Sequence, residues 1–238
     1  MTRKVLAYEV QSLQQAEKRA VAAADAVSVV SGTDIERLRG DVGPLLATKT
    51  WLIPPGVNFP EASLRTRRCR EFIFVGSDSL LQNKLTIEFL IDLWAAAAPQ
   101  APLRIVGRMI GNYARSPGVI FEGFVADLGT VYRDDVVALC PSFIEGGIKT
   151  KVLEALGRGV IPVGNDLTFQ GMGCEPGCLA MSHEDIRAFV CEPEPQIERM
   201  REAATWLRKC VYKRYSFEAV TEAWSEVVSA SPLVVTQT

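Results

Sequence analysis

The segment at 143–156 (FIEGGIKTKVLEAL) places two adjacent glycines, two lysines and two glutamates just before and inside a predicted helix. Because the segment follows a predicted strand, we expect the backbone amides of residues 146–148 at the N-terminus of that helix. Adjacent glycines allow a diphosphate to approach the backbone closely, and the helix dipole attracts its negative charge. Either Lys149 or Lys151 supplies a point charge to the same oxygens, or both lysines are solvated beside an ordinary glycine turn.

Glu154 lies eight residues after Gly146, about two helical turns into the predicted helix, and its helical neighbours are mostly apolar. A carboxylate in such surroundings needs a partner, because an unpaired buried charge is costly. The two vicinal hydroxyls of a ribose are suitable donors. A salt bridge to a neighbouring lysine is the alternative.

From residue 71 onward, predicted strands alternate with predicted helices, which is typical of a parallel sheet with helices on both faces. The predicted fold class is therefore α/β and Rossmann-like. An open sheet of this kind binds ligands beyond the carboxyl ends of its strands, so we expect a site in the loops there. The predicted strands are 72–75, 103–106, 119–121, 135–140 and 160–163, and the predicted helices are 81–98, 127–132 and 150–157.

The first 58 residues have a different pattern. Helix formers predominate at 7–24, a β-rich run follows at 25–31, and Thr33 and Asp34 are candidate caps of a short helix. A further strand at 51–57 ends in a Pro-Pro-Gly turn. We divide the chain into a remnant of a preceding domain (1–58), a linker (59–70), a Rossmann-like domain (71–230) that includes C-terminal helices, and a tail (231–238). The basic cluster at 65–70 is either a solvated surface or an anion site.

Charge and cysteine content exclude several classes of protein. The 26 basic and 28 acidic residues nearly balance, so we expect no binding to nucleic acid. No transmembrane run and no signal peptide is evident, which indicates a cytoplasmic protein. The six cysteines lack the spacing of a disulfide scaffold and are expected to be free thiols. Cys174, Cys178 and His183 do not complete a metal site, and we predict none.

A series of short motifs runs along the chain: FVGS at 74–77, IVGR at 105–108, EGFVAD at 122–127, CPS at 140–142, GG at 146–147 with KVLEA at 151–155, and GVIPV at 159–163. Their order resembles the C-terminal, donor-binding domain of retaining glycosyltransferases of the GT-B fold, in the group 1 type. The resemblance covers residues 70 to 230, with a terminal helix beginning at 216. The stretches at 24–31 and 53–57 resemble the last strand of the N-terminal domain and the crossover.

The resemblance implies roles for individual residues. Gly76 and Ser77 match the glycine loop that faces the donor diphosphate. Arg108 matches the loop that borders the base, and Phe124 and Val125 match the backbone segment that pairs with the base. The donor itself would be a nucleotide diphosphate sugar, with no cofactor and no metal. The sequence indicates no dedicated catalytic residue.

The resemblance also implies that the second glycine loop surrounds the donor sugar and that Glu154 holds the ribose. That loop consists of Glu145, Gly146, Gly147 and Ile148. Many relatives have a glutamate where this chain has Gly146, with Glu145 displaced by one position. Relatives also carry cations where this chain has Ser77 and Asp78, so neutralisation of the phosphates would depend on Lys149, Lys151 and helix dipoles.

Enzymes of this type have two such domains, and 58 residues are too few for the first one. We therefore expect a chain truncated at its N-terminal side, whose strand at 26–31 stands unpaired and requires a separate N-terminal half or self-association. The predicted function is hexosyl transfer from a nucleotide diphosphate sugar to an unknown acceptor. The alternative is a non-catalytic nucleotide-binding or partner-binding remnant; an epimerase of the same fold is a more distant possibility.

Overall fold

The structure is a computed structural model that describes residues 3–43, 49–61 and 63–230. Its larger part is a five-stranded, fully parallel β-sheet in the order β5-β4-β3-β6-β7. The predicted α/β class and the predicted parallel pairing are both confirmed. The strands are β3 (Glu71–Val75), β4 (Leu103–Val106), β5 (Val119–Gly123), β6 (Val136–Leu139) and β7 (Ile161–Val163).

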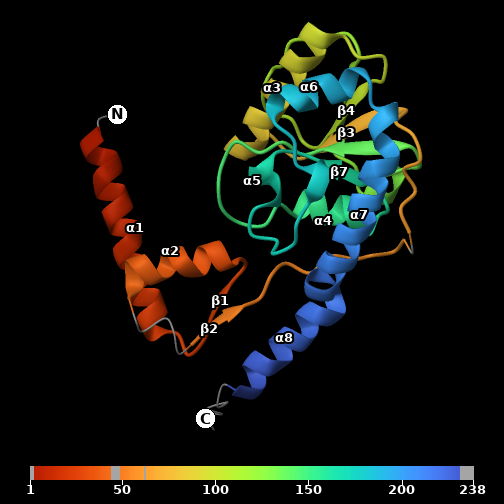
Figure 1. The fold of residues 1–238 in the computed structure, drawn as a ribbon. Coiled ribbons are helices and arrows are strands. Elements are labelled where there is room, and N and C mark those ends of the chain that lie inside the picture. Colours follow the sequence, from red (N-terminus) through yellow and green to blue (C-terminus); the bar gives the residue numbers. More distant parts are fainter. Residues whose placement is uncertain (1–2, 44–48, 62, 231–238) are drawn as a thin grey trace.

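Helices cover both faces of this sheet (Figure 1). On one face α3 packs with α6, and on the other α4 packs with α7. Strands β3, β4, β6 and β7 are almost wholly buried, as parallel strands with two covered faces must be, whereas the edge strand β5 is largely exposed. The helices are α3 (Leu81–Ala97), α4 (Thr150–Gly157), α5 (Asp166–Phe169), α6 (His183–Cys191), α7 (Glu194–Tyr215) and α8 (Phe217–Ala230), with short 3₁₀ turns η2 (Leu128–Thr130) and η3 (Gly177–Leu179).

The segment predicted to be a linker makes polar contacts with the sheet. Thr66 is fully buried, and its hydroxyl donates to the carbonyl of Val136 at 2.8 Å and accepts from the N–H of Ile161 at 3.3 Å. Neighbouring arginines pair with carboxylates, among them Arg68 with Asp135 at 2.8 Å. Arginines of the basic cluster are thus ion-paired near the start of β6, while Thr66 contacts both β6 and β7. Periodicity does not reveal such polar contacts.

The N-terminal residues form a small unit of α1 (Arg3–Ala23), β1 (Val27–Val29), α2 (Gly32–Val42) and β2 (Thr50–Leu52). The expectation of an unpaired strand is wrong, because β1 pairs in parallel with β2. Both strands are shorter than predicted. The cap of α2 is also corrected: Ser31 accepts from the N–H of Asp34, and Thr33 lies inside the helix. The predicted tail at 231–238 lies outside the described residues.

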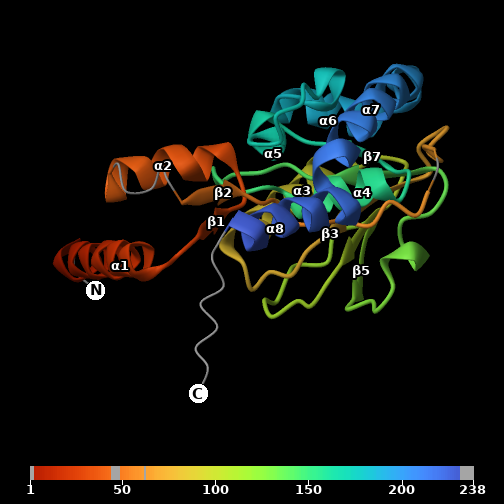
Figure 2. The same ribbon diagram turned by 90° about the horizontal axis from the view of Figure 1, so that it is seen from below.

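The C-terminal helix α8 connects the small unit to the sheet domain. Ile53, just after β2, packs with Val220 and Val227 of α8 in a second hydrophobic cluster. The N–H of Val57 donates to the carbonyl of Tyr215 at 2.7 Å, immediately before α8 begins. Figure 2 shows α1 and α2 projecting to one side of the sheet domain, with β1 and β2 at the junction.

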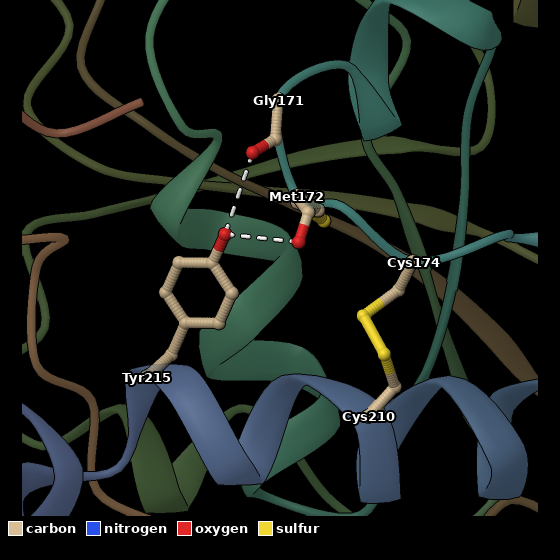
Figure 3. The surroundings of a disulfide bond; sticks show 5 residues. All are labelled: Gly171, Met172, Cys174, Cys210 and Tyr215. Carbon is tan, nitrogen blue, oxygen red and sulfur yellow. Dashed lines mark hydrogen bonds between the residues drawn. A yellow bond between two sulfur atoms is a disulfide. The ribbon is translucent and has the colours of Figure 1, made fainter. Parts of the chain in front are cut away.

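A disulfide joins Cys174 to Cys210, with Cα atoms 6.3 Å apart (Figure 3). The expectation of six free thiols is wrong for this pair, because α7 brings Cys210 beside a loop 36 positions earlier. Next to the disulfide, the hydroxyl of Tyr215 donates to the carbonyl of Met172 at 3.1 Å. The loop at 170–174 is therefore attached to α7 at two points.

Replacing both Cys174 and Cys210 by serine is expected to lower the free energy of unfolding by about 2–4 kcal/mol, because the crosslink restricts the unfolded chain. Equilibrium urea denaturation without reductant measures the difference. Cys191→Ser, which removes an exposed free thiol, is the matched control and should leave the midpoint unchanged. Six free thiols in the denatured, unreduced wild-type protein would contradict the assignment.

Candidate functional site

A cavity of about 620 Å³ lies at the carboxyl edge of the sheet, where β3, β4 and β5 end. Five residues that the sequence singled out line it together: Gly76, Ser77, Arg108, Phe124 and Val125. Phe124 is 72% exposed and forms part of its rim. Sequence reasoning did not assign the other wall residues, which include Ser79, Gly107, Ile110, Ala126 and Leu128.

The loops around this cavity are held together by backbone contacts. The N–H of Gly76 donates to the carbonyl of Val106 at 2.9 Å, and the N–H of Gly107 donates to the carbonyl of Gly123 at 2.8 Å. Gly107 has φ +144, and a Cβ there would lie 2.3 Å from the carbonyl oxygen of Gly76. Only glycine permits this approach.

Asn83 and Lys151 connect the first glycine loop to α4. The side-chain amide of Asn83 donates to the carbonyl of Ser77 at 2.9 Å, and the ammonium of Lys151 donates to the amide oxygen of Asn83 at 2.6 Å. The same ammonium lies 4.4 Å from the centre of the Phe74 ring. Burial lowers the pKa of Lys151 to about 8, so a charge beside this loop is costly to maintain without an anion.

The second glycine loop lies beside the cavity and does not line it. Gly146 and Gly147 have φ +89 and +64, and a Cβ at either position would meet no atom within 4 Å. The ammonium of Lys149 is directed into the loop and donates to the carbonyls of Ile144 at 3.2 Å and Gly146 at 2.6 Å. Burial lowers the pKa of Lys149 as well.

The remaining predicted residues of this loop are Glu145, which is exposed, and Ile148, which is half-buried. Ile148 faces Gly171, and the N–H of Gly146 donates to the side-chain oxygen of Gln170 at 3.5 Å. The loop at 170–174 therefore lies against the second glycine loop. Sequence reasoning missed this contact, and no spacing in the sequence signals it.

Glu154 is half-buried on α4 and also lies outside the cavity lining. Within the described part of the chain its carboxylate has no salt bridge, so the lysine pairing considered above is not observed. Its charge is close enough to Tyr132 to contribute to a raised pKa of that phenol, although burial is the main cause. Tyr132 donates its N–H to the carbonyl of Leu128, which lines the cavity.

Of the candidate metal ligands, Cys174 and His183 make other contacts. Cys174 is in the disulfide, and the ring of His183 lies 4.9 Å from the rings of both Phe89 and Phe143. Across the ranges that the structure describes, no three His, Cys, Asp or Glu side chains come together as a metal site would require. None of the helices described combines the length and apolar character needed to cross a membrane.

This arrangement, a parallel sheet with glycine loops and a cavity at its carboxyl edge, defines a Rossmann-like α/β domain. Residues 69–192 match the family model of the group 1 glycosyltransferases, and the chain belongs to this family. No curated protein matches the chain significantly.

Solved structures show the same fold. Sucrose-phosphate synthase from Thermosynechococcus elongatus aligns with a TM-score of 0.70 and 19% identity, over 92% of this chain and 61% of its own. HepE of Anabaena, solved with UDP and glucose, aligns with a TM-score of 0.71 and 15% identity, over 92% of this chain and 67% of the HepE chain. TarM of S. aureus aligns with a TM-score of 0.69 and 12% identity, over 90% of this chain and 46% of the TarM chain. The chain thus spans between about half and two thirds of the length of these GT-B structures.

Lys151→Met is expected to raise the free energy of unfolding at pH 7 by about 1–3 kcal/mol, from the lowered pKa of the buried ammonium. The folded state carries the whole cost of this charge below pH 8, and the cost disappears as the pH rises toward the ordinary pKa of 10.5. Urea denaturation at pH 7 and pH 10 should show the gain at pH 7 only. Lys84→Met, at an exposed lysine, is the control. A variant less stable than wild type at pH 7 would refute this account.

Proposed function

We propose that the chain forms the donor-binding half of a glycosyltransferase, which holds a nucleotide diphosphate sugar for hexosyl transfer to an acceptor. The observation that carries this proposal is the cavity at the carboxyl edge of the sheet. Its five sequence-predicted wall residues come from three separate loops of a domain that belongs to the group 1 family.

The chemistry of the walls suits a nucleoside diphosphate. The glycine loop at Gly76 and Ser77 leaves room for phosphates close to the backbone. The resemblance implied that Arg108 borders the base, but Arg108 lines the cavity together with Gly76 and Ser77, so we assign its cation to the phosphates instead. At the other end, the exposed Phe124 ring and the backbone of Val125 suit a base. Glu154, beyond Leu128, would accept hydrogen bonds from the ribose hydroxyls.

The transfer step depends on stabilising the departing diphosphate, because negative charge develops there as the glycosidic bond breaks. Lys151 beside the first glycine loop and the amides of Gly146 and Gly147 before α4 are suited to this task. Diphosphate binding would favour the charged form of Lys151, whose pKa is lowered in the free protein. The retaining outcome is an expectation from the family resemblance.

UDP is the natural first probe of the donor. HepE was solved with UDP and glucose, TarM with UDP, and the pneumococcal transferase GtfA with UDP and GlcNAc. These contacts belong to those proteins, and their low identity to this chain leaves the base and sugar open here. Binding assays should therefore test a panel of nucleotide sugars after UDP.

The acceptor requires a second wall facing the donor cavity. The N-terminal unit contributes a sheet of two strands in the described residues, and two strands alone seldom form a stable layer. This observation favours a second α/β domain against β1 and β2. It also favours the alternative function, a nucleotide-binding or partner-binding module without turnover.

We expect the 238-residue chain to bind UDP and to transfer sugar at near background rates. Positioning of acceptor against donor contributes several kcal/mol to a transfer step, and that contribution is lost without the second wall. Isothermal titration with UDP and nucleotide release from UDP-sugars, with and without acceptors, test the two parts. A monomer with ordinary enzyme rates on a defined acceptor would contradict the need for a second wall, and absence of UDP and other nucleotide binding would contradict the proposed function.

Glu154→Ala is expected to weaken UDP affinity by about 1.5–3 kcal/mol, the range for hydrogen bonds to a charged group. Calorimetry on the folded variant measures the loss, and the same comparison with the 2′-deoxy nucleotide should show a smaller one. Glu202→Ala, an exposed glutamate on α7, is the control and should bind as wild type. Unchanged UDP affinity in a folded Glu154→Ala protein would remove Glu154 from the site.

A further inference from the structure

The carboxylate of Asp78 lies just behind the wall of the cavity without lining it. Asp78 is 9% exposed and follows the first glycine loop. Its oxygens accept from the N–H of Ile110 at 2.8 and 2.9 Å, from the N–H of Gly111 at 2.7 Å and from the hydroxyl of Tyr113 at 3.0 Å. All of these donors belong to the loop at 108–113 that follows β4.

The same loop is held at two further points. The hydroxyl of Ser77 donates to the carbonyl of Arg108 at 2.8 Å. The ring of Tyr113 stacks on Phe121 of β5, with centroids 5.7 Å apart and planes 15° apart. The loop has no regular secondary structure of its own, so these attachments fix its backbone. Asp78 supplies most of them.

The fixed loop presents two side chains to the cavity, Arg108 and Ile110. Ile110 is 74% exposed. Arg108 is the cation among the residues that line the cavity, and in the described parts of the chain no carboxylate pairs with its guanidinium.

We propose that Asp78 is a positioning residue of the donor site: its carboxylate fixes the 108–113 loop so that Arg108 meets the phosphates of the bound nucleotide. A guanidinium binds phosphate oxygens through paired hydrogen bonds, which demand a defined position of the side chain. Asp78 contacts no ligand and acts through Arg108. This assignment rests on the proposed function, because it takes a nucleoside diphosphate as the ligand.

A double-mutant cycle with Asp78→Asn and Arg108→Gln tests the assignment. Asparagine keeps the size of aspartate but loses the negative charge and one of the two acceptor oxygens, which weakens the attachment. Each single variant should weaken UDP binding by about tenfold or more, as expected for a lost charge-assisted contact. The double variant should bind no more weakly than Arg108→Gln alone, and Arg108→Gln should affect UDP more than UMP.

Asp135→Asn is the matched control. Asp135 also accepts from a backbone N–H, that of Arg67 at 3.3 Å, but it precedes β6 at the opposite edge of the sheet. Its substitution should leave UDP affinity unchanged. Equal losses from Asp78→Asn with and without Arg108 would overturn the coupling, because a general effect on folding is independent of that side chain.

Amide hydrogen exchange provides a readout that needs no ligand. In Asp78→Asn the amides of Ile110 and Gly111 should exchange faster than in wild type, while those of β3 remain protected. Unchanged exchange at these two amides would overturn the role of Asp78 whatever the protein binds. Wild-type protein that fails to bind UDP and every other nucleotide would instead refute the proposed function, and the role of Arg108 with it.

Discussion

The close contact between the backbones of Gly76 and Gly107 determines the geometry of the whole carboxyl edge. A side chain at Gly107 would collide with the carbonyl oxygen of Gly76, so the loops after β3 and β4 can meet only because this position is glycine. Once they meet, Ser77 reaches the carbonyl of Arg108, and Asp78 reaches Ile110, Gly111 and Tyr113. This part of the cavity wall is therefore one continuous hydrogen-bonded surface made from the loops after β3 and β4.

Buried charge is distributed unevenly around this wall. Asp78 is fully satisfied by hydrogen-bond donors, which hold its pKa below the ordinary value, the Gly111 N–H first among them. Lys149 and Lys151 are satisfied by oxygens but lie in surroundings that lower their pKa. Such a site is electrostatically prepared for an anion, because binding one relieves the cost that the lysines impose on the free protein.

The loop at 170–174 relates this site to the N-terminal unit. At Gly171 a Cβ would lie 3.3 Å from Ile148 and 3.4 Å from Ser31, so the second glycine loop and the start of α2 meet at this residue. Tyr215 and the disulfide attach the same loop to α7. Because α8 continues from α7 and packs on β2, the position of the small unit and that of the second glycine loop depend on the same elements.

The sequence by itself determined the parallel sheet and its helices α3 and α4, and the family resemblance read from its motifs named the five residues that meet in the cavity. Strand periodicity and glycines at strand ends are local signals, and the order of strands then brings those loops to one edge. The tertiary structure alone decided the rest. The bracing by Thr66, the disulfide, the β1–β2 pairing and the attachment of Asp78 all join residues whose spacing follows no period. Polar contacts of this kind arise only when folding brings distant donors and acceptors together, and a linear pattern does not encode which will meet.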